Sequence, residues 1–477
     1  MVETSLLLDR DCDGDSQIRI ANVIAALSYA LDLAEGQPEG HAVRTCFIGM
    51  RLARELRLEA ADCAALFYAL LLKDIGGTAV SSKICCLFGA DDRAVKRGLK
   101  TADWSNLSNT VQFVSRHVIP EGSPFQRAVR TAVVALEGPN GPSRIIRARC
   151  EFGARVVRQL GFGEATASSI RNIDERWDGR GHPAALRGKE IPLLARIAGL
   201  SQMIDIFSTA GGPAAAIGMA GERCGTWFDP QVVESFLSLT GDGQFWDRLA
   251  SPGLFADVVS LEPDELALTG SPAALDRIAR AFAEVTDAKS PWTFRHSEGV
   301  ARIAVGMANV LGLSDEAVAR VYRAGLLHDI GKLAVSNLIL DKPGHLTSEQ
   351  YGELRRHPEQ TLKILERTPA LADLAELAAT HHERLDGRGY HRGIRAGELP
   401  IESRLLAVAD ISEALAAKRP YRDAMTRERV EEVLMKEAGT AVCPECVSAL
   451  QKYHERSDIL SRVNGQLNAL EEVMAGL

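Results

Sequence analysis

Several features of membrane, exported and nucleic-acid-binding proteins are missing from this sequence of 477 residues. No run approaches the roughly 18 to 20 apolar residues that a membrane-spanning helix needs, and the start, MVETSLLLDRDCDGDS, lacks the basic residues and long apolar core of a signal peptide. Lysine and arginine total 55 against 63 aspartates and glutamates, so the positive excess typical of polyanion binding is absent. The sequence therefore predicts a cytoplasmic protein that binds neither a membrane nor a nucleic-acid polymer.

A disulfide framework is also not indicated. The nine cysteines are odd in number and scattered along the chain, which is typical of reduced thiols. The motif Cys443-Pro444-Glu445-Cys446 has the spacing of a metal or redox pair, but the sequence has no second such motif. We interpret its cysteines as structural.

Strand-like alternation of polar and apolar residues is rare as well. Hydrophobic residues make up 46% of the chain and recur mostly at intervals of three and four, which predicts amphipathic helices. A chain of this length can bury more than one core. We therefore expect an all-α protein of two or three domains.

Two stretches of the sequence are repeated. Residues 40–77 align without gaps on residues 295–332 at an offset of 255, and the stretch DERWDGRG at Asp174 aligns on HERLDGRG at His382 at an offset of 208. The difference of 47 residues is extra material in the first copy, between residues 77 and 150. Solenoid repeats are much shorter, so the pattern predicts two tandem domains.

Proline- and glycine-rich stretches suggest where these domains meet, notably SPG at 251–253 and LTGSP at 268–272. We predict four parts, namely an N-terminal segment at 1–15, a first copy at 16–247, a linker at 248–269 and a second copy at 270–477.

Histidine is concentrated in the second copy, where seven of the eleven histidines fall between residues 296 and 391. Adjacent His-His and His-Asp pairs in apolar helices would bury uncompensated polar groups unless something binds them. Imidazole and carboxylate ligands suit Fe, Mn, Ni or Zn, and seven of them exceed the needs of one tetrahedral ion, which favours two metal ions. The predicted ligands are His296, His328, Asp329, His357, His381, His382 and Asp410. We interpret His345, His391 and His454 as ordinary polar residues.

The segments HSEGV, LLHDIGKLAV, HPEQT, HHERLDGRGY and VADISEAL, followed by KRPYR, resemble the successive motifs of the HD-GYP family, a branch of the HD metal-dependent phosphohydrolases. The resemblance runs from about residue 280 to about residue 460. It implies two tandem HD-type helical bundles in this chain and a dinuclear centre of iron or manganese. It also implies hydrolysis of cyclic di-GMP to pGpG or GMP, although some family members act on cyclic GMP-AMP.

The resemblance also assigns roles to single residues. Asp329 would bridge the two metals, and Lys332 would lie beside the nucleophile and the phosphate. Tyr390 would contact a guanine, and Arg419 and Arg422 would hold substrate phosphates, since guanidinium groups fit phosphate oxygens well. The two metals would lower the pKa of bound water and take up charge on the phosphoryl oxygens.

The second copy departs from the family pattern at two positions. His391 replaces the proline of the GYP motif, so the loop loses a residue of fixed φ, which bears on substrate specificity more than on hydrolysis. Trp292 stands where members with a third metal carry a glutamate. A dinuclear centre is therefore expected.

The first copy lacks the ligand set. Lys73 replaces the first histidine of the His-Asp pair, and its ammonium group could neutralise the retained Asp74 without a metal. The other ligand positions hold His41, Cys150, Ile173, Asp174 and Gln202. We predict a catalytically silent copy, which leaves open whether it packs against the second copy, senses a nucleotide or controls access to the catalytic site.

The function predicted from the sequence is that of a metal-dependent phosphodiesterase acting on a cyclic dinucleotide, with cyclic di-GMP favoured. Two alternatives stay open, namely a catalytically weak signalling scaffold or nucleotide receptor, and an HD phosphohydrolase acting on another nucleotide. A homodimer and a signalling-protein partner are both compatible with the sequence.

Overall fold

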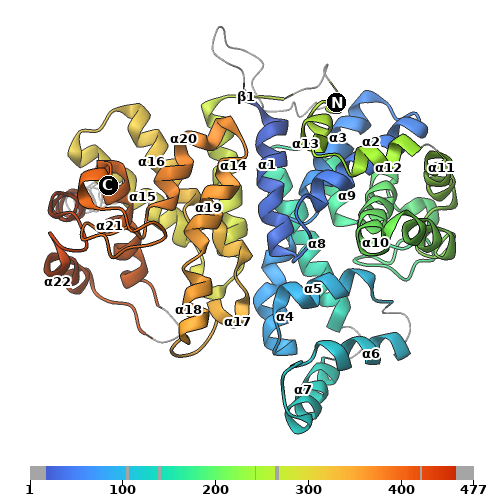
Figure 1. Cartoon of the computed structure of the whole chain (residues 1–477), viewed down its shortest axis with the longest axis horizontal. Helices are drawn as coiled ribbons and strands as arrows, with labels where there is room; N and C mark the ends of the chain where they lie inside the picture. The colour runs from blue at the N-terminus through green and yellow to red at the C-terminus, as the bar shows by residue number, and fades with distance from the viewer. Residues whose placement is uncertain are drawn as a thin grey trace, which may run out of the picture. The chain divides into compact units, whose positions relative to one another are not determined.

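The computed structural model of the chain describes residues 18–103, 107–137, 141–241, 243–263, 268–418 and 422–457. Nearly all regular structure in these ranges is helical (Figure 1). Two short strands, β1 (Ile18–Arg19) and β2 (Thr269–Gly270), pair antiparallel, with Ile18 opposite Gly270. The prediction of an all-α protein is confirmed.

The chain divides into two compact units. Unit 1 comprises Met1–Pro291 and Lys332–Lys342, and unit 2 comprises Trp292–Gly331 and Pro343–Leu477. The division falls later in the sequence than the predicted linker at 248–269, because α14 (Pro272–Asp287) packs within unit 1 against β2 and α8. The domain limits drawn from the sequence stay a prediction.

Unit 1 contains fourteen further α-helices in the part of the chain that the structure describes. They are α1 (Ile20–Ala34), α2 (His41–Glu55), α3 (Ala60–Leu72), α4 (Ser81–Phe88), α5 (Asp92–Thr101), α6 (Leu107–His117), α7 (Pro124–Leu136), α8 (Gly141–Gln159), α9 (Glu164–Arg171), α10 (Leu193–Glu222), α11 (Pro230–Thr240), α12 (Gly243–Leu249), α13 (Leu254–Val259) and α17 (Asn337–Leu340). Short 3-10 helices occur at η1 (Gly77–Val80) and η2 (Gly188–Glu190).

Unit 2 is built from α15 (His296–Leu311), α16 (Asp315–Leu327), α18 (Ser348–Leu354), α19 (His357–Leu365), α20 (Pro369–Ala379), α21 (Ile401–Ala416) and α22 (Arg427–Glu437). A short 3-10 helix lies at η6 (Ala396–Glu398), and two others, η4 (Pro291–Thr293) and η5 (Ile330–Ala334), span the limits between the two units in the sequence. Local sequence sets these limits. The Ser314 hydroxyl accepts the Ala317 N–H at the start of α16, and Gly312 ends α15 in the left-handed region.

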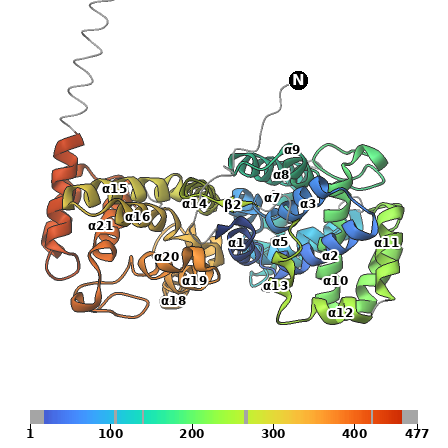
Figure 2. The ribbon, with the colours of Figure 1, turned by 90° about the horizontal axis from the view of Figure 1, so that it is seen from above.

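The same helix pairs pack in each unit. In unit 2, α15 packs on α16 and α21, and α19 packs on α20, as Figures 1 and 2 show. In unit 1 the repeat-related helices make the same pairs, since α2 packs on α3 and α10, and α8 packs on α9. The prediction of two tandem helical bundles is confirmed.

The region of the first copy that contains the 47 extra residues, between residues 77 and 150, includes α4 to α7 and the start of α8. A hydrophobic cluster holds it together, built from Val80, Ile84, Phe88, Ala90, Val95, Phe113, Val114, Val118 and Ile145. Figure 1 shows α6 and α7 at one end of unit 1. This region matters for function because α5 carries Lys96 and Lys100.

One stretch, Ala60–Phe88, is long and apolar enough to cross a membrane by length and composition, but 78% of its most apolar window is buried inside the protein. It therefore has the burial of a core helix of unit 1. The cysteines in the described residues are all free, as predicted for reduced thiols, and Cys12 lies outside these residues.

Candidate metal centre

Five histidines and two aspartates converge inside unit 2. α15 begins at His296, α16 ends just before His328 and Asp329, and α19 begins at His357. α20 ends shortly before the remaining histidine pair, and α21 carries the second aspartate. Six of the seven residues are at most 6% exposed. The ligands predicted from the sequence are His296, His328, Asp329, His357, His381, His382 and Asp410, and the structure brings all seven together.

The seven residues form two neighbouring groups. His357, His381 and His382 offer ligand atoms within 4.8 Å of one another, and so do His296, His328 and Asp410. Asp329 faces both groups. Its Oδ1 atom lies 3.4 Å from Nε2 of His357, and its Oδ2 atom lies 3.5 Å from Nε2 of His296. The carboxylate of Asp329 therefore lies between the two groups of side chains.

Backbone carbonyls fix the orientation of three imidazole rings. Nδ1 of His328 donates to the carbonyl oxygen of Gly325 at 2.7 Å, and Nδ1 of His357 donates to Leu354 at the same distance. Nδ1 of His381 donates to Ala378 at 2.6 Å. With its proton on Nδ1, each ring presents an unprotonated Nε2 atom to the centre, which is the form that binds a metal.

A carboxylate of α21 fixes the fourth ring. Nδ1 of His296 bonds to the carboxylate of Glu413, one helical turn after Asp410. The sequence analysis missed this residue. A signal was present in the repeat, because Glu413 aligns at the offset of 208 with Asp205, whose Oδ2 atom lies 2.6 Å from Nδ1 of His41 in unit 1. Such outer hydrogen bonds orient metal ligands and raise their basicity.

Close backbone packing brings the ligand-bearing segments together. A Cβ atom on Gly331 would lie 1.9 Å from the carbonyl oxygen of His357, so only glycine allows this approach. The Gly331 N–H donates to Thr361 Oγ1 at 3.1 Å, and the Thr361 hydroxyl donates to the His328 carbonyl at 2.8 Å. The glycine of the LLHDIGK segment therefore lets α19 lie against the His-Asp pair.

The electrostatics of the centre favour a cation. Burial lowers the pKa of His296, but its hydrogen bonds with Asp329, Asp410 and Glu413 outweigh burial and raise the pKa well above its ordinary value. Burial opposes ionisation of Asp410, yet the neighbouring imidazoles of His296 and His328 outweigh burial and hold its pKa well below the ordinary value. The field that attracts a proton to His296 attracts a metal cation in the same way.

The donor set fits a metal. The buried Nε2 atom of His328 has no hydrogen-bond partner among the described residues, and buried polar atoms are rarely left unsatisfied without a reason. Imidazole nitrogens together with carboxylate oxygens match the ligand preferences of divalent transition metals. These residues of unit 2 can therefore hold divalent ions.

A pocket opens beside the histidine pair. It is lined by Tyr351, Arg355, His381, His382, Glu383, Arg384, Arg388, Gly389, Tyr390, Ile411, Ala441 and Val442. The Tyr390 ring lies 4.7 Å from the His382 ring, and the Arg355 guanidinium group lies over it at 4.6 Å. The exposed guanidinium group of Arg388 also reaches this pocket. The pocket thus joins the candidate metal centre to an aromatic ring and two cations.

The loop that carries Tyr390 is held by a buried carboxylate. Glu383 accepts the backbone N–H groups of Arg392 and Gly393 at Oε1, at 2.8 and 3.1 Å, and that of Ile394 at Oε2, at 3.0 Å. In unit 1, Glu175 accepts backbone N–H groups of the corresponding loop. The carboxylate therefore fixes the loop even though His391 replaces the family's proline.

The three remaining predicted residues are less closely tied to the site. Lys332 lies in η5, three residues after Asp329. Arg422 donates to the carbonyl oxygens of Ala414 and Leu415 at 2.8 Å and so holds the end of α21. Arg419 lies outside the described residues. The roles of these residues at the substrate stay predictions.

The corresponding positions of unit 1 hold an ion-pair network. Lys73 and Lys100 both contact the Asp74 carboxylate, and Nη2 of Arg149 lies 2.9 Å from Asp74 Oδ1. Burial, together with Lys73, lowers the pKa of His41 to about 4. Among the described residues, every candidate group of metal ligands belongs to unit 2.

Comparisons with known proteins agree with this geometry. The HD domain family model matches residues 280–445. The chain is 39% identical to the 3'3'-cGAMP-specific phosphodiesterase 3 of Vibrio cholerae over 433 residues, which are 91% of this chain and 94% of that protein. A cyclic di-GMP phosphodiesterase of Thermotoga maritima is 38% identical over 173 residues, which are 36% of this chain and 47% of that protein.

A solved structure shows the same architecture. The crystal structure of a cyclic GMP-AMP specific phosphodiesterase of Vibrio cholerae, V-cGAP3, matches with a TM-score of 0.63 at 34% identity and covers 92% of this chain and 98% of that chain. The similarity spans both units, and the phosphohydrolase ligand set is present in the second. The chain therefore belongs to the HD-GYP family of HD-domain phosphohydrolases.

Proposed function

We propose that this protein is a metal-dependent phosphodiesterase that hydrolyses a cyclic dinucleotide, with 3'3'-cGAMP favoured over cyclic di-GMP. The extent of the similarity supports this substrate, because the 3'3'-cGAMP-specific enzyme matches over 91% of this chain, whereas the cyclic di-GMP enzyme of Thermotoga maritima matches over 36%. The sequence analysis favoured cyclic di-GMP. The motifs of the second copy do not by themselves distinguish cyclic di-GMP from 3'3'-cGAMP.

We further propose that the centre holds two divalent ions, iron or manganese, and that Asp329 contacts both. Bound there, two such ions supply a nucleophile from water at neutral pH and stabilise the charge that develops on the phosphoryl oxygens. Asp329 supports this role through its two oxygens, which face His357 and His296. Lys332 follows on the same segment and would place a positive charge near the scissile phosphate.

The pocket beside the centre would hold the rest of the substrate. His382 is 24% exposed at its side chain, so the ligand set opens toward this pocket. The Tyr390 ring and the Arg355 guanidinium plane would stack on a purine base, and Arg388 would contact a phosphate. Glu383 would hold the loop of Tyr390 in place.

The test measures metal content and hydrolysis of the full chain together. Anaerobically purified protein is analysed for iron and manganese and assayed with 3'3'-cGAMP, cyclic di-GMP and cyclic di-AMP. We expect about two ions per chain and linear product, with the highest kcat/KM for 3'3'-cGAMP.

The variant Asp329→Ala should lose both metal and hydrolysis, whereas Asp373→Ala, an exposed aspartate of α20, should retain both. Higher kcat/KM for cyclic di-GMP would overturn the proposed substrate. Full metal content and hydrolysis in Asp329→Ala would overturn the proposed site.

A further inference from the structure

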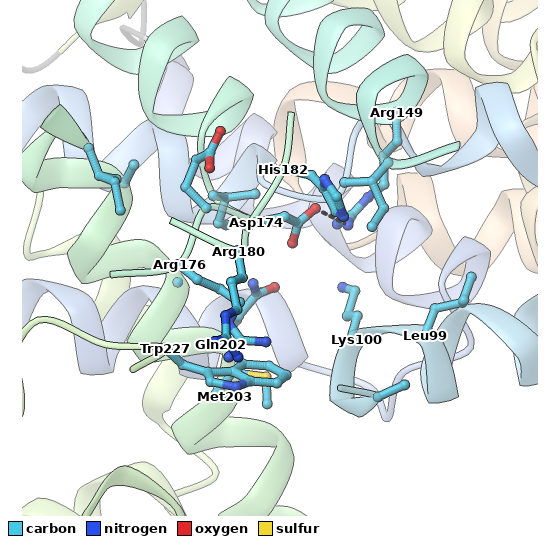
Figure 3. A pocket seen from close by; sticks show the side chains of 18 of the residues that line it. Leu99, Lys100, Arg149, Asp174, Arg176, Arg180, His182, Gln202, Met203 and Trp227 are labelled. Carbon is cyan, nitrogen blue, oxygen red and sulfur yellow. Dashed lines mark hydrogen bonds and ion pairs between the residues drawn. The ribbon is translucent and has the colours of Figure 1, made fainter. Parts of the chain in front are cut away.

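A pocket in unit 1 corresponds to the catalytic pocket of unit 2 (Figure 3). Arg176 and Arg180 line it, and they align at the offset of 208 with Arg384 and Arg388, which line the pocket of unit 2. The copy without metal ligands has therefore kept the pocket and its two arginines.

Cations of the protein stand at the inner end of this pocket. Lys100 and Arg149 line it and contact the Asp74 carboxylate. Lys73 contacts the same carboxylate, and Arg149 also pairs with Asp174 at 2.9 Å. In Figure 3, Lys100 reaches into the open space of the pocket.

Positive charge is in excess in the connected network. Its lysines and arginines number six and its carboxylates five, with His41 between Asp74 and Asp205, namely Arg44, Lys73, Lys96, Lys100, Arg149 and Lys289 with Glu35, Asp74, Asp92, Asp174 and Asp205. The side chains of Lys96 and Lys100 are each 3% exposed. Such a network has no place for a metal ion but attracts an anion, and low-dielectric surroundings strengthen that attraction.

The outer part of the pocket combines an aromatic ring with guanidinium groups. The segment GTWF at residues 225–228 aligns on GTAV at residues 439–442, so Trp227 lines the pocket where unit 2 has Ala441. The Arg176 guanidinium group lies 4.4 Å from the Trp227 ring centroid, and Arg180 is exposed at the mouth. Aromatic and guanidinium planes are the usual stacking surfaces for nucleotide bases.

A buried amide completes the lining. Gln202, which stands at the position of Asp410, is 4% exposed, and its side-chain oxygen accepts no hydrogen bond from the described residues. It lines the pocket and is labelled there in Figure 3. Buried amides are normally satisfied, so an unsatisfied one facing a cavity points to a ligand atom as its partner.

We propose that this pocket of unit 1 binds a nucleotide through its phosphate without any metal ion. Lys100 and Arg149 supply the positive charge that metals supply in the catalytic copy. Arg180 contacts the phosphate from the mouth, and Trp227 with Arg176 holds the base. A mononucleotide and a cyclic dinucleotide share this chemistry, and the experiment separates them.

The test is binding to the full-length Asp329→Ala variant in excess EDTA, so that neither hydrolysis nor metal contributes. Calorimetry measures 3'3'-cGAMP, cyclic di-GMP, GMP, AMP and inorganic phosphate at concentrations up to about 1 mM. We expect saturable binding of a nucleotide that weakens as salt rises. Adding Arg180→Ala should weaken it about tenfold, the usual loss for one charge-assisted contact, and Arg180→Glu should weaken it further.

Two matched variants locate the binding. Arg248→Ala removes an exposed arginine of unit 1 that pairs with Asp257 outside the pocket and should leave the affinity unchanged. Arg388→Ala removes the aligned arginine of unit 2 and weakens only nucleotide bound there, so the binding that Arg180→Glu weakens should persist in Arg388→Ala. Circular dichroism melting checks that each variant is folded.

Tighter binding of GMP or AMP, or of a cyclic dinucleotide, supports the proposal and identifies the ligand type. The proposal is overturned if no nucleotide binds, or if only inorganic phosphate binds. It is also overturned if Arg388→Ala abolishes binding while Arg180→Glu does not, because the nucleotide then occupies unit 2. Since hydrolysis is not measured, failure here is distinct from failure of the proposed catalytic function.

Discussion

Replacing Glu413 tests whether the outer hydrogen bond to His296 supports metal binding. Loss of such a partner costs about 10- to 100-fold in metal affinity, which is about 1.4 to 2.7 kcal/mol. Glu413→Gln keeps an oxygen that can accept the Nδ1 proton of His296 and should fall near the lower end, whereas Glu413→Ala should fall near the upper end. Only one group of candidate ligands contains His296. The metal affinity should therefore fall at one of the two proposed positions.

The measurement is a titration of the full chain with Mn(II) in chelator-buffered solutions, followed by elemental analysis and by hydrolysis. We expect the Glu413 variants to keep one ion where the native protein keeps two, and to regain activity at high Mn(II). Glu402→Gln is the control, because Glu402 lies on the same helix and pairs with Arg320. Unchanged affinity at both positions in Glu413→Ala would refute the reasoning.

Three further changes follow from the structure. Gly331→Ala should destabilise unit 2 by about 1 to 3 kcal/mol, because the new Cβ would lie 1.9 Å from the His357 carbonyl oxygen. Calorimetry measures this loss. The control is Gly352→Ala, which has open space around the new Cβ and should leave the stability unchanged or raise it. Glu383→Gln should raise KM about tenfold with a smaller change in kcat, since an amide cannot accept N–H groups at both ends; equal KM would show that Glu383 does not position Tyr390. Chelation should abolish hydrolysis and Mn(II) should restore it, and activity that survives chelation would contradict a metal-dependent reaction.

The residues that converge in unit 2 could be predicted from the sequence because most of them are chemically conspicuous. Paired His-His and His-Asp residues in apolar helices are costly to bury unless a cation binds them, and the repeat showed which positions matter. Glu413 was missed because its function arises from packing of α15 on α21, which periodicity does not reveal. The sequence aligns Glu413 with Asp205. An acidic residue on a helix is usually exposed to solvent, however, so this alignment alone does not predict a hydrogen bond to a histidine.

The unit boundary could not be found from proline and glycine. β2 belongs to unit 1 because it pairs with β1, more than 200 residues earlier in the sequence. The segment around α17 belongs there because the Asn337 N–H donates to Asp92 Oδ1 at 2.9 Å and its amide donates to the Lys289 carbonyl at 2.7 Å. These are long-range contacts, and turn residues mark only where a chain can bend.

The two copies differ in what compensates the charge of the buried aspartate in the His-Asp position. A buried carboxylate such as Asp74 or Asp329 is costly unless positive charge compensates it. In unit 1, burial opposes the ionisation of Asp74, but Lys100, Lys73 and Arg149 outweigh it and hold its pKa well below the ordinary value. Lys100 lies on α5, so a helix of unit 1 supplies the positive charge that a bound metal would supply in unit 2. Because this charge is part of the protein, the proposed binding in unit 1 requires no metal, whereas the proposed hydrolysis in unit 2 requires one.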